Sequence, residues 1–250
     1  MNIKTELNIL FKFICEEFDR NFLLLGGYLL GNLFTKDARL SSDIDIHLYT
    51  FEADVRVKQH LNNIATNLIK EFPHITYKIR EPKDGTHSWG LMFFKNERFF
   101  IGVDIQVLRH SSAKLSDYTE KIIDGQYVYC YTIENIVADK LRALLSHARY
   151  RRAKDLYDLY IILLNSDINT QAVQELLEPH MSTLQICFDE ESLEKMFHAY
   201  DKLTLFGIET EYITKPEFAK VYNYFSNLVT ELLQYARNWH KDSQCFLDSK

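Results

Sequence analysis

The segment 23–48 constrains the fold of this chain most, because it joins a glycine pair to two closely spaced acids. Gly26 and Gly27 follow an apolar run and predict a turn into a short helix, since glycine tolerates backbone conformations that other residues avoid. The chain then returns as a strand, in which Asp43 and Asp45 point to the same face. We therefore expect a strand, a glycine turn, a helix and a second strand that carries paired carboxylates.

These two features together predict a site for metal and phosphate. Carboxylates about 7 Å apart along a strand can share a pair of divalent cations. A glycine turn before a helix offers backbone N–H groups and the positive end of the helix dipole to a phosphate. Taken singly, a Gly-Gly pair is usually only a turn, and Asp-x-Asp is usually a solvated strand edge. Adjacent acids on one face repel each other unless a cation lies between them, so the combination favours the site.

A third acid lies in a later apolar strand. Asp104 is flanked by Val103 and Ile105, which face the other way, so it shares its face with Gly102 and Gln106. Burying an ionised group in a core strand is costly unless it is paired or bound to a metal. Asp104 either meets water on a half-exposed sheet or completes a metal-binding triad with Asp43 and Asp45. The presence of that acid pair favours the triad.

Hydrophobic periodicity divides the chain into a mixed front part and a helical back part. In the front part we expect helices at 3–20, 28–34 and 52–72, and strands at 43–46, 75–80, 89–94, 99–108 and 127–131. After Thr132 we expect helices at 133–148, 152–164, 170–179, 189–203 and 215–240. The fold class is therefore α+β, with one domain at 1–131 and a helical domain at 132–250.

Composition narrows the functional classes. The net charge of −6 argues against sequence-blind binding of nucleic acid over the whole surface, although a local basic patch remains compatible with it. No apolar run is long enough for a membrane span, and the N-terminus lacks a signal peptide, so we expect a cytoplasmic protein. The widely spaced cysteines predict reduced thiols rather than a disulfide framework or a zinc site. These are Cys15, Cys130, Cys187 and Cys245.

A basic cluster at 149–154 precedes two acids, Asp155 and Asp158, that share one helical face. One explanation is a solvated helix with the ion pairs Arg151–Asp155 and Lys154–Asp158. Each cation would then lie N-terminal to its acid, which is the less favourable order. The other explanation, which we favour, is a basic cluster that meets a polyanion and is oriented by the acids.

Catalysis by histidine or cysteine has little support in the sequence. His47 lies on the face of the acid pair if the strand continues regularly, where it is either a ligand or a rim residue, and we favour the rim. The chain contains neither a GxSxG motif nor a GxxxxGK[ST] motif, which argues against an α/β-hydrolase and a P-loop enzyme.

Five short motifs occur in one order between residue 23 and about residue 165. They are Gly26-Gly27, Arg39-Leu40-Ser41-Ser42-Asp43-Ile44-Asp45, the strand residue Asp104, Lys140-Leu141-Arg142-Ala143-Leu144 and Arg152-Ala153-Lys154-Asp155-Leu156-Tyr157-Asp158. This order resembles the AbiEii/AbiGii-type toxin family of nucleotidyltransferases, within the polymerase-β-like superfamily. The resemblance implies a nucleotidyltransferase-fold domain, a mixed sheet flanked by helices, followed by a C-terminal helical bundle.

The resemblance also implies a reaction and its residues. A nucleoside monophosphate would pass from an NTP to an acceptor, with Mg²⁺ or Mn²⁺ as cofactor. Asp43, Asp45 and Asp104 would be both the metal ligands and the catalytic residues. The residues implied in nucleotide binding are Gly26, Gly27, Arg39, Ser41, Lys140, Arg152, Lys154, Asp155 and Asp158.

The resemblance further suggests the toxin of a toxin–antitoxin system, with RNA or tRNA as acceptor, a cognate antitoxin as partner and no membrane. One alternative is an enzyme that modifies a small molecule such as an antibiotic. A second alternative is a catalytically inactive nucleotide-binding module. Its support is Tyr28, because the family commonly has a small or hydroxylic residue directly after the glycine pair.

Overall fold

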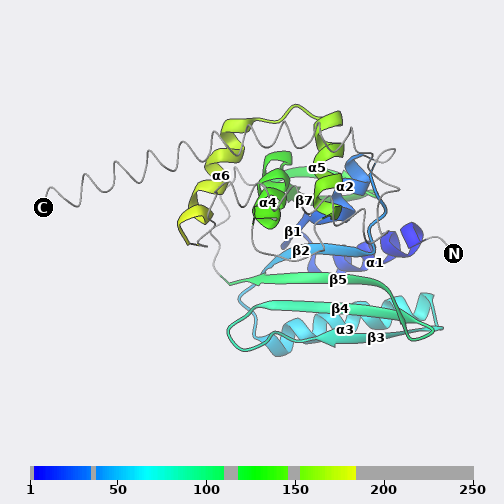
Figure 1. Cartoon of the computed structure of the whole chain (residues 1–250). Helices are drawn as coiled ribbons and strands as arrows, with labels where there is room; N and C mark the ends of the chain where they lie inside the picture. Colours follow the sequence, from blue (N-terminus) through cyan, green and yellow to red (C-terminus); the bar gives the residue numbers. More distant parts are fainter. Residues whose placement is uncertain (1–2, 35–37, 110–117, 146–152, 184–250) are drawn as a thin grey trace, which may run out of the picture. The chain divides into compact units, whose positions relative to one another are not determined.

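A computed structural model describes residues 3–34, 38–109, 118–145 and 153–183. These residues fall into two compact units, one that ends at Thr132 and one that begins at Ile133 (Figure 1). The expected division into domains at 1–131 and 132–250 stays a prediction, because residues 184–250 lie outside the described part of the chain.

The first unit is built on one mixed sheet of seven strands in the order β3-β4-β5-β2-β1-β7-β6 (Figure 1). The strands are β1 (Phe22–Leu25), β2 (Asp43–Tyr49), β3 (Ile75–Arg80), β4 (Ser88–Lys95), β5 (Arg98–Leu108), β6 (Tyr118–Ile123) and β7 (Gln126–Tyr131). The helices are α1 (Ile3–Phe18), α2 (Gly26–Leu33) and α3 (Asp54–Glu71). The sheet flanked by helices confirms the expected architecture of this part of the chain.

Strand β2 lies in the middle of the sheet between β1 and β5. It pairs with β1 in antiparallel and with β5 in parallel orientation, so both of its edges are hydrogen-bonded. On one side, β5 pairs with β4 and β4 pairs with β3, both in antiparallel orientation, so β3 is the edge strand. On the other side, β7 pairs with β1 in parallel and carries β6 at the edge.

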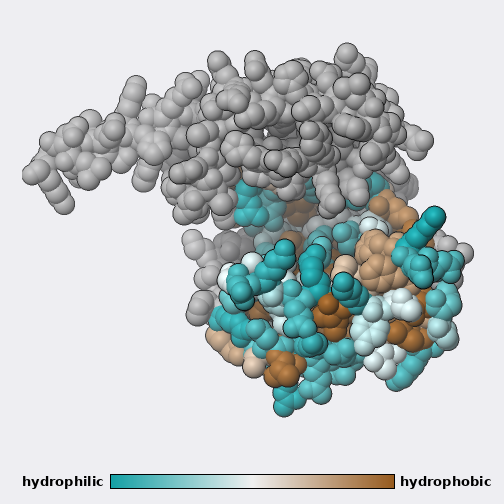
Figure 2. Space-filling view, turned by 60° about the horizontal axis from the view of Figure 1, so that its bottom comes forward, coloured by the Kyte–Doolittle hydropathy of each residue, from teal (hydrophilic) through white to brown (hydrophobic). Residues whose placement is uncertain are grey.

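Strict alternation along β2 separates a core face from a polar face. Ile44, Ile46 and Leu48 are buried, whereas Asp43 and Asp45 are only partly buried. Helix α1 contacts β2 and β5, and α3 contacts α1 and β3, so these helices cover the core face (Figure 1). The side of the described residues shown in Figure 2 is mainly hydrophilic, with hydrophobic side chains in separate patches.

The described part of the second unit contains three helices, α4 (Ile133–Leu145), α5 (Ala153–Asn165) and α6 (Thr170–Thr183). Helix α4 contacts both α5 and α6. The side chain of Asn169 caps α6 by accepting a hydrogen bond from the backbone N–H of Ala172 at 3.2 Å. The expected helices at 189–203 and 215–240 lie outside the described residues, and so does most of the expected helical bundle.

Two local expectations differ from the structure. Helix α2 begins at Gly26 rather than at Tyr28, because the glycine turn is itself the first turn of the helix. Strand β6 was not expected, since it is an edge strand whose residues are mostly exposed and do not alternate.

The described cysteines, Cys15 and Cys130, are free thiols. Burial raises the pKa of Cys15 to about 12 and that of Cys130 to about 11, so neither is a reactive thiolate at neutral pH. Among the helices of the described residues, none is long and apolar enough to cross a membrane.

Candidate active site

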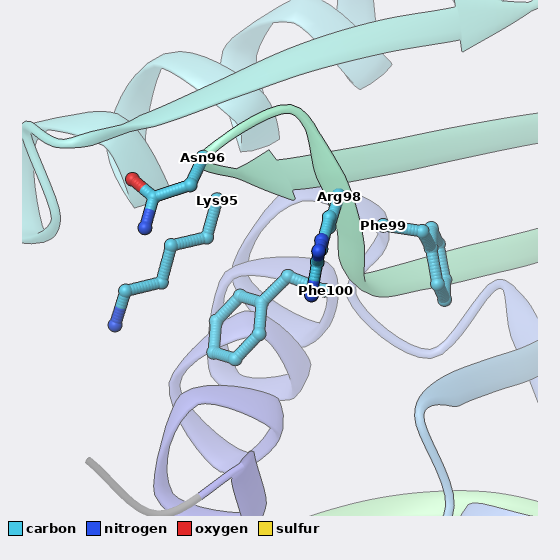
Figure 3. A pocket seen from close by; sticks show the side chains of 5 residues that line it. All are labelled: Lys95, Asn96, Arg98, Phe99 and Phe100. Carbon is cyan, nitrogen blue, oxygen red and sulfur yellow. The ribbon is translucent and has the colours of Figure 1, made fainter.

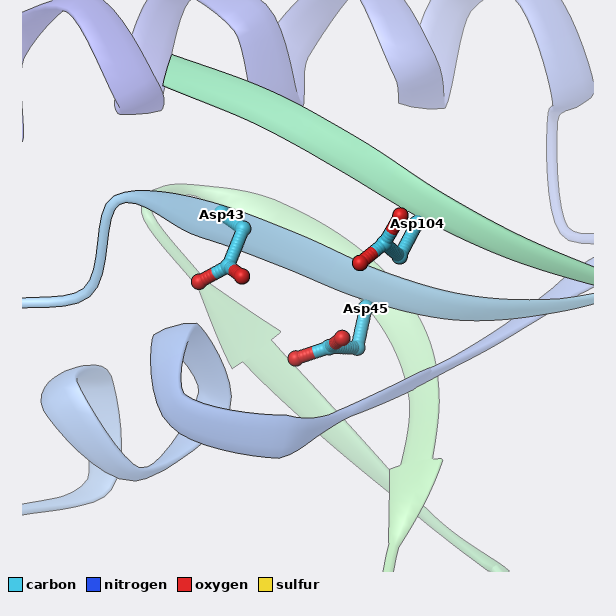
Figure 4. Close-up of side chains that lie close together, drawn as sticks. All are labelled: Asp43, Asp45 and Asp104. Carbon is cyan, nitrogen blue, oxygen red and sulfur yellow. The ribbon is translucent and has the colours of Figure 1, made fainter. Parts of the chain in front are cut away.

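Three carboxylates meet on the polar face of the sheet, where β2 and β5 run side by side (Figure 4). Asp43 and Asp45 come from β2, and Asp104 stands opposite Asp45 in the parallel register of β5. Each residue offers one ligand atom, and these atoms all lie within 4.8 Å of one another. The structure therefore brings Asp104 beside Asp43 and Asp45, the pair that strand periodicity had placed on one face, as the expected triad requires.

The glycine turn lies directly against this acid cluster. Gly26 has a φ of +74°, a left-handed conformation that favours glycine. A Cβ atom added at Gly26 would lie 1.9 Å from Oδ2 of Asp45, which is far too close for any side chain. Leu25, at the N-cap of α2, has no side-chain oxygen to accept from the first N–H groups of the helix. The turn therefore presents these donors and the positive helix end beside Asp45.

The loop that returns from α2 to β2 packs onto the second glycine of the pair. A Cβ atom at Gly27 would lie 2.9 Å from Oγ of Ser41 and 3.0 Å from Nη2 of Arg39. The buried Ser41 hydroxyl donates a hydrogen bond to Oδ1 of Asp43 at 2.9 Å. Ser41 thus fixes one carboxylate of the cluster, and Arg39 brings a positive charge to the glycine turn, as a phosphate site requires.

Tyr28 does not point into the site. Its ring is buried against Phe11, with 5.1 Å between ring centroids, and its hydroxyl donates a hydrogen bond to Asn8 at 3.1 Å. Burial raises the pKa of Tyr28 well above its ordinary value, so the hydroxyl stays protonated and can donate. The large residue after the glycine pair is therefore part of the core and leaves the turn open.

Sequence reasoning missed one residue of this site, Arg80 at the end of β3. Its guanidinium donates to Oδ1 of Asp104 at 2.8 Å, with both side chains about half exposed. To reach Asp104 it crosses Gly90 on β4, where an added Cβ atom would lie 3.1 Å from Nε of Arg80. The signals present in the sequence were a glycine within the apolar strand 89–94 and an arginine at the end of the strand 75–80.

His47 lies on the same face of β2 but farther along the strand. It is outside the group of acids that could hold a metal, and its Nδ1 is 3.3 Å from the hydroxyl of Tyr131. This placement agrees with a rim residue rather than a ligand.

In the second unit, Lys140 of α4 is buried between two acids of α5. Its Nζ lies 2.6 Å from Oδ2 of Asp158 and 3.1 Å from Oδ1 of Asp155. Burial lowers the pKa of Lys140, but the charges and hydrogen bonds of the two carboxylates outweigh burial and hold the pKa above its ordinary value. The ammonium group therefore stays charged and links α4 to α5.

These contacts differ from the ion pairs within one helix that were considered for Asp155 and Asp158, since both acids bind Lys140 of the other helix. Arg152 lies outside the described residues, and the side chain of Lys154 is outside them too. Nucleotide binding by these residues stays a prediction.

Comparison with solved structures shows the fold of this chain. JHP933 from Helicobacter pylori superposes with a TM-score of 0.53 at 16% identity, covering 96% of this chain and 98% of that one. A second Helicobacter pylori structure, described as a candidate nucleotidyltransferase, gives 0.54 at 16% identity, with 93% and 97% covered. The antibiotic-resistance factor ANT(2'')-Ia gives 0.50 at 14% identity, with 73% and 92% covered. The fold is that of a nucleotidyltransferase.

The family follows from the sequence. Residues 8–206 match the profile of the family described as nucleotidyl transferase AbiEii toxin, type IV toxin–antitoxin system. The chain therefore belongs to the AbiEii family of nucleotidyltransferase toxins, as its motif order had predicted. No curated protein matches the chain. The family description implies an NTP substrate and a cognate antitoxin.

Proposed function

We propose that this nucleotidyltransferase transfers a nucleoside monophosphate from an NTP to RNA, in a reaction that depends on Mg²⁺ or Mn²⁺. The observation that carries the proposal is the meeting of three carboxylates within 4.8 Å, directly beside the glycine turn at Gly26. Acids alone are common on protein surfaces. Acids beside a helix N-terminus and Arg39 form a site that can hold a cation and a polyphosphate together.

The residues fit a divalent cation. Mg²⁺ and Mn²⁺ prefer carboxylate oxygens, and the cluster offers oxygens from Asp43, Asp45 and Asp104 at mutual distances that one or two ions can bridge. Ser41 and Arg80 each bind one oxygen of a cluster carboxylate and so restrict its rotation. When bound, the cation would neutralise charge on the triphosphate and make the acceptor hydroxyl more acidic.

The chain's own groups would orient the reactants. The N–H groups of the Gly26–Gly27 turn and the guanidinium of Arg39 would hold the phosphates beside Asp45. The acceptor oxygen forms a bond to the α-phosphorus, the bond from that phosphorus to the bridging oxygen breaks, and pyrophosphate leaves. The hydroxyl proton would pass to a carboxylate oxygen of Asp104, the acid of the cluster that is most open to solvent.

The acceptor class is tested directly. The purified protein is incubated with each α-labelled NTP and Mg²⁺ or Mn²⁺, together with total RNA, tRNA or a panel of aminoglycosides. We expect label on RNA, loss of labelling in Asp43→Ala and unchanged labelling in Asp84→Ala, a matched change at an exposed turn residue. Label on an aminoglycoside would instead support the antibiotic-modifying alternative; ANT(2'')-Ia, which is similar in fold, is described as an antibiotic-resistance factor. Label on neither would overturn the proposal.

A further inference from the structure

The polar face of the sheet continues from the acid cluster across β5, β4 and β3. Directly paired residues share a face, so strand register maps this surface. One row across the strands is Arg80, Gly90, Asp104 and Asp45, the next is Lys78, Met92, Gly102 and Asp43, and the third is Thr76, Phe94 and Phe99. We call these residues of β3, β4 and β5 the open face.

A β-bulge brings Phe99 onto the open face. Phe93 pairs with Ile101, but Phe94 pairs with Phe99, so Phe100 is an extra residue in β5. Without the bulge, alternation back from Asp104 would place Phe99 on the buried face. Figure 3 shows the result, with the ring of Phe99 turned away from the side chain of Phe100.

The ring of Phe99 packs against Gly102 and Phe94. A Cβ atom at Gly102 would lie 3.2 Å from Cε2 of Phe99, so the ring lies over this glycine, next to Asp43 in the register. Phe94 contacts it edge to face, with 6.3 Å between ring centroids. Nevertheless Phe99 remains 49% exposed. It is a large aromatic side chain fixed in place beside the acid cluster, with half of its surface uncovered.

Two cationic side chains, Lys78 and Arg80, lie on the open face together with Phe99. Lys78 is exposed one row from Asp104 on the open face, and Arg80 binds Asp104 with one N–H group of a guanidinium that carries five. Cations beside an exposed aromatic ring are the combination that proteins use to bind single strands of nucleic acid, with bases stacked on the ring and phosphates on the cations.

We propose that the open face binds the acceptor as single-stranded RNA, with a base stacked on Phe99 and the backbone contacting Lys78 and Arg80. This inference rests on the proposed function and names the acceptor site. Sheet order separates it from the triphosphate: the glycine turn lies on the β1 side of β2, and Phe99 lies on the β5 side. The acid cluster stands between them, as in-line transfer from one to the other requires.

The test measures RNA binding by the full chain without NTP, using fluorescence anisotropy of a short fluorescein-labelled oligoadenylate RNA. Stacking on an aromatic ring is sequence-tolerant, and its removal in Phe99→Ala should weaken binding by roughly 5- to 100-fold. Phe99→Trp should retain binding, which separates loss of the ring from misfolding. The matched control is Phe51→Ala. Phe51 is 78% exposed and follows the C-terminal end of β2, whereas Asp43 begins that strand, so this variant should bind RNA as the wild type does.

A second pair of variants tests the charge. Lys78→Ala should weaken binding and reduce the slope of log affinity against log salt by about 0.7, the value for one phosphate contact on a single strand. Lys83→Ala, at an exposed turn residue, should leave the slope unchanged. Equal slopes in both variants would overturn the contact assigned to Lys78.

Binding of a fluorescent ATP analogue separates the two substrates. Phe99→Ala should leave it unchanged, and weaker binding of the analogue with normal binding of RNA would overturn the assignment to the acceptor. If the wild type labels RNA while Phe99→Ala and Phe51→Ala bind it equally, this inference fails and the proposed function stands. If the wild type labels no RNA, the proposed function itself fails.

Discussion

Alanine at Gly26 should damage the acid cluster through one specific collision. The new Cβ atom would lie 1.9 Å from Oδ2 of Asp45 and 2.6 Å from its Cγ, so the carboxylate must move. The φ of +74° adds a cost of about 1–2 kcal/mol for a residue with a Cβ atom. Moving Asp45 adds about 1 kcal/mol by loss of its local interactions. At about 2–4 °C per kcal/mol, Tm should fall by about 4–12 °C.

The structure offers a matched control for the strain alone. Gly85 has a φ of +76°, but an added Cβ atom there meets nothing within 4 Å. Gly85→Ala should therefore lower Tm by only the conformational part, about 2–8 °C from the same strain and the same conversion. Any additional effect of Gly26→Ala must come from the displaced carboxylate.

Function should separate the two variants more clearly than stability does. Displacement of a reacting group by about 1 Å can cost about 100-fold in rate, so labelling by Gly26→Ala should fall by about that factor. Mn²⁺ affinity, measured by isothermal titration calorimetry, should fall in Gly26→Ala and stay at the wild-type value in Gly85→Ala. Equal Mn²⁺ affinity and equal labelling in the two variants would refute the argument that the glycine turn and Asp45 form one site.

Two further predictions concern ion pairs outside the acid cluster. Lys140→Ala should destabilise the fold by about 3–5 kcal/mol in chemical denaturation, because it removes the ammonium group that Oδ2 of the buried Asp158 contacts at 2.6 Å. His60 is bound by Glu17 at 2.7 Å and Glu52 at 2.9 Å; burial lowers its pKa, but these carboxylates outweigh burial and raise the pKa above its ordinary value. The contribution of His60 to stability should be full below the ordinary value of 6.5 and disappear as pH rises through the raised pKa.

Controls for both predictions lie on the surface of the same protein. Lys12→Ala removes a cation from an exposed ion pair and should cost less than about 1 kcal/mol; an equal loss in Lys140→Ala would contradict the buried pair. For His60, the unfolding free energies of wild type and His60→Gln are compared across neutral pH. Their difference should shrink as pH rises, and a constant difference would show that the protonated ring contributes nothing.

The site could be predicted from sequence wherever regular strand geometry determines it. Alternation alone placed Asp43 and Asp45 on one face and separated Asp104 from its apolar neighbours. Parallel pairing of β2 with β5 then sets Asp45 opposite Asp104, a register that no local pattern in either strand reveals. The direction in which each carboxylate points was therefore predictable from the sequence. That Asp104 lies beside Asp45 depends on the order of the strands in the sheet.

Sequence reasoning missed the placement of Phe99 and Arg80 and the partners of Lys140, because these depend on irregular or long-range geometry. Phe99 has the wrong parity for the polar face, and only the extra residue Phe100 moves it there. Arg80 reaches Asp104 because Gly90 leaves its path open across an intervening strand. Lys140 pairs with acids of another helix, whereas periodicity within one helix suggested only local partners.

The position of β2 has a consequence for how such enzymes can diverge. Two of the three acids lie on a strand hydrogen-bonded along both edges, and the third lies on its neighbour, which is likewise paired on both sides. Lys78 and Arg80, by contrast, belong to the outermost strand on that side. On the proposed assignment of the open face, substitutions at Lys78 would change how the acceptor is bound, while the three acids on the inner strands stay in place.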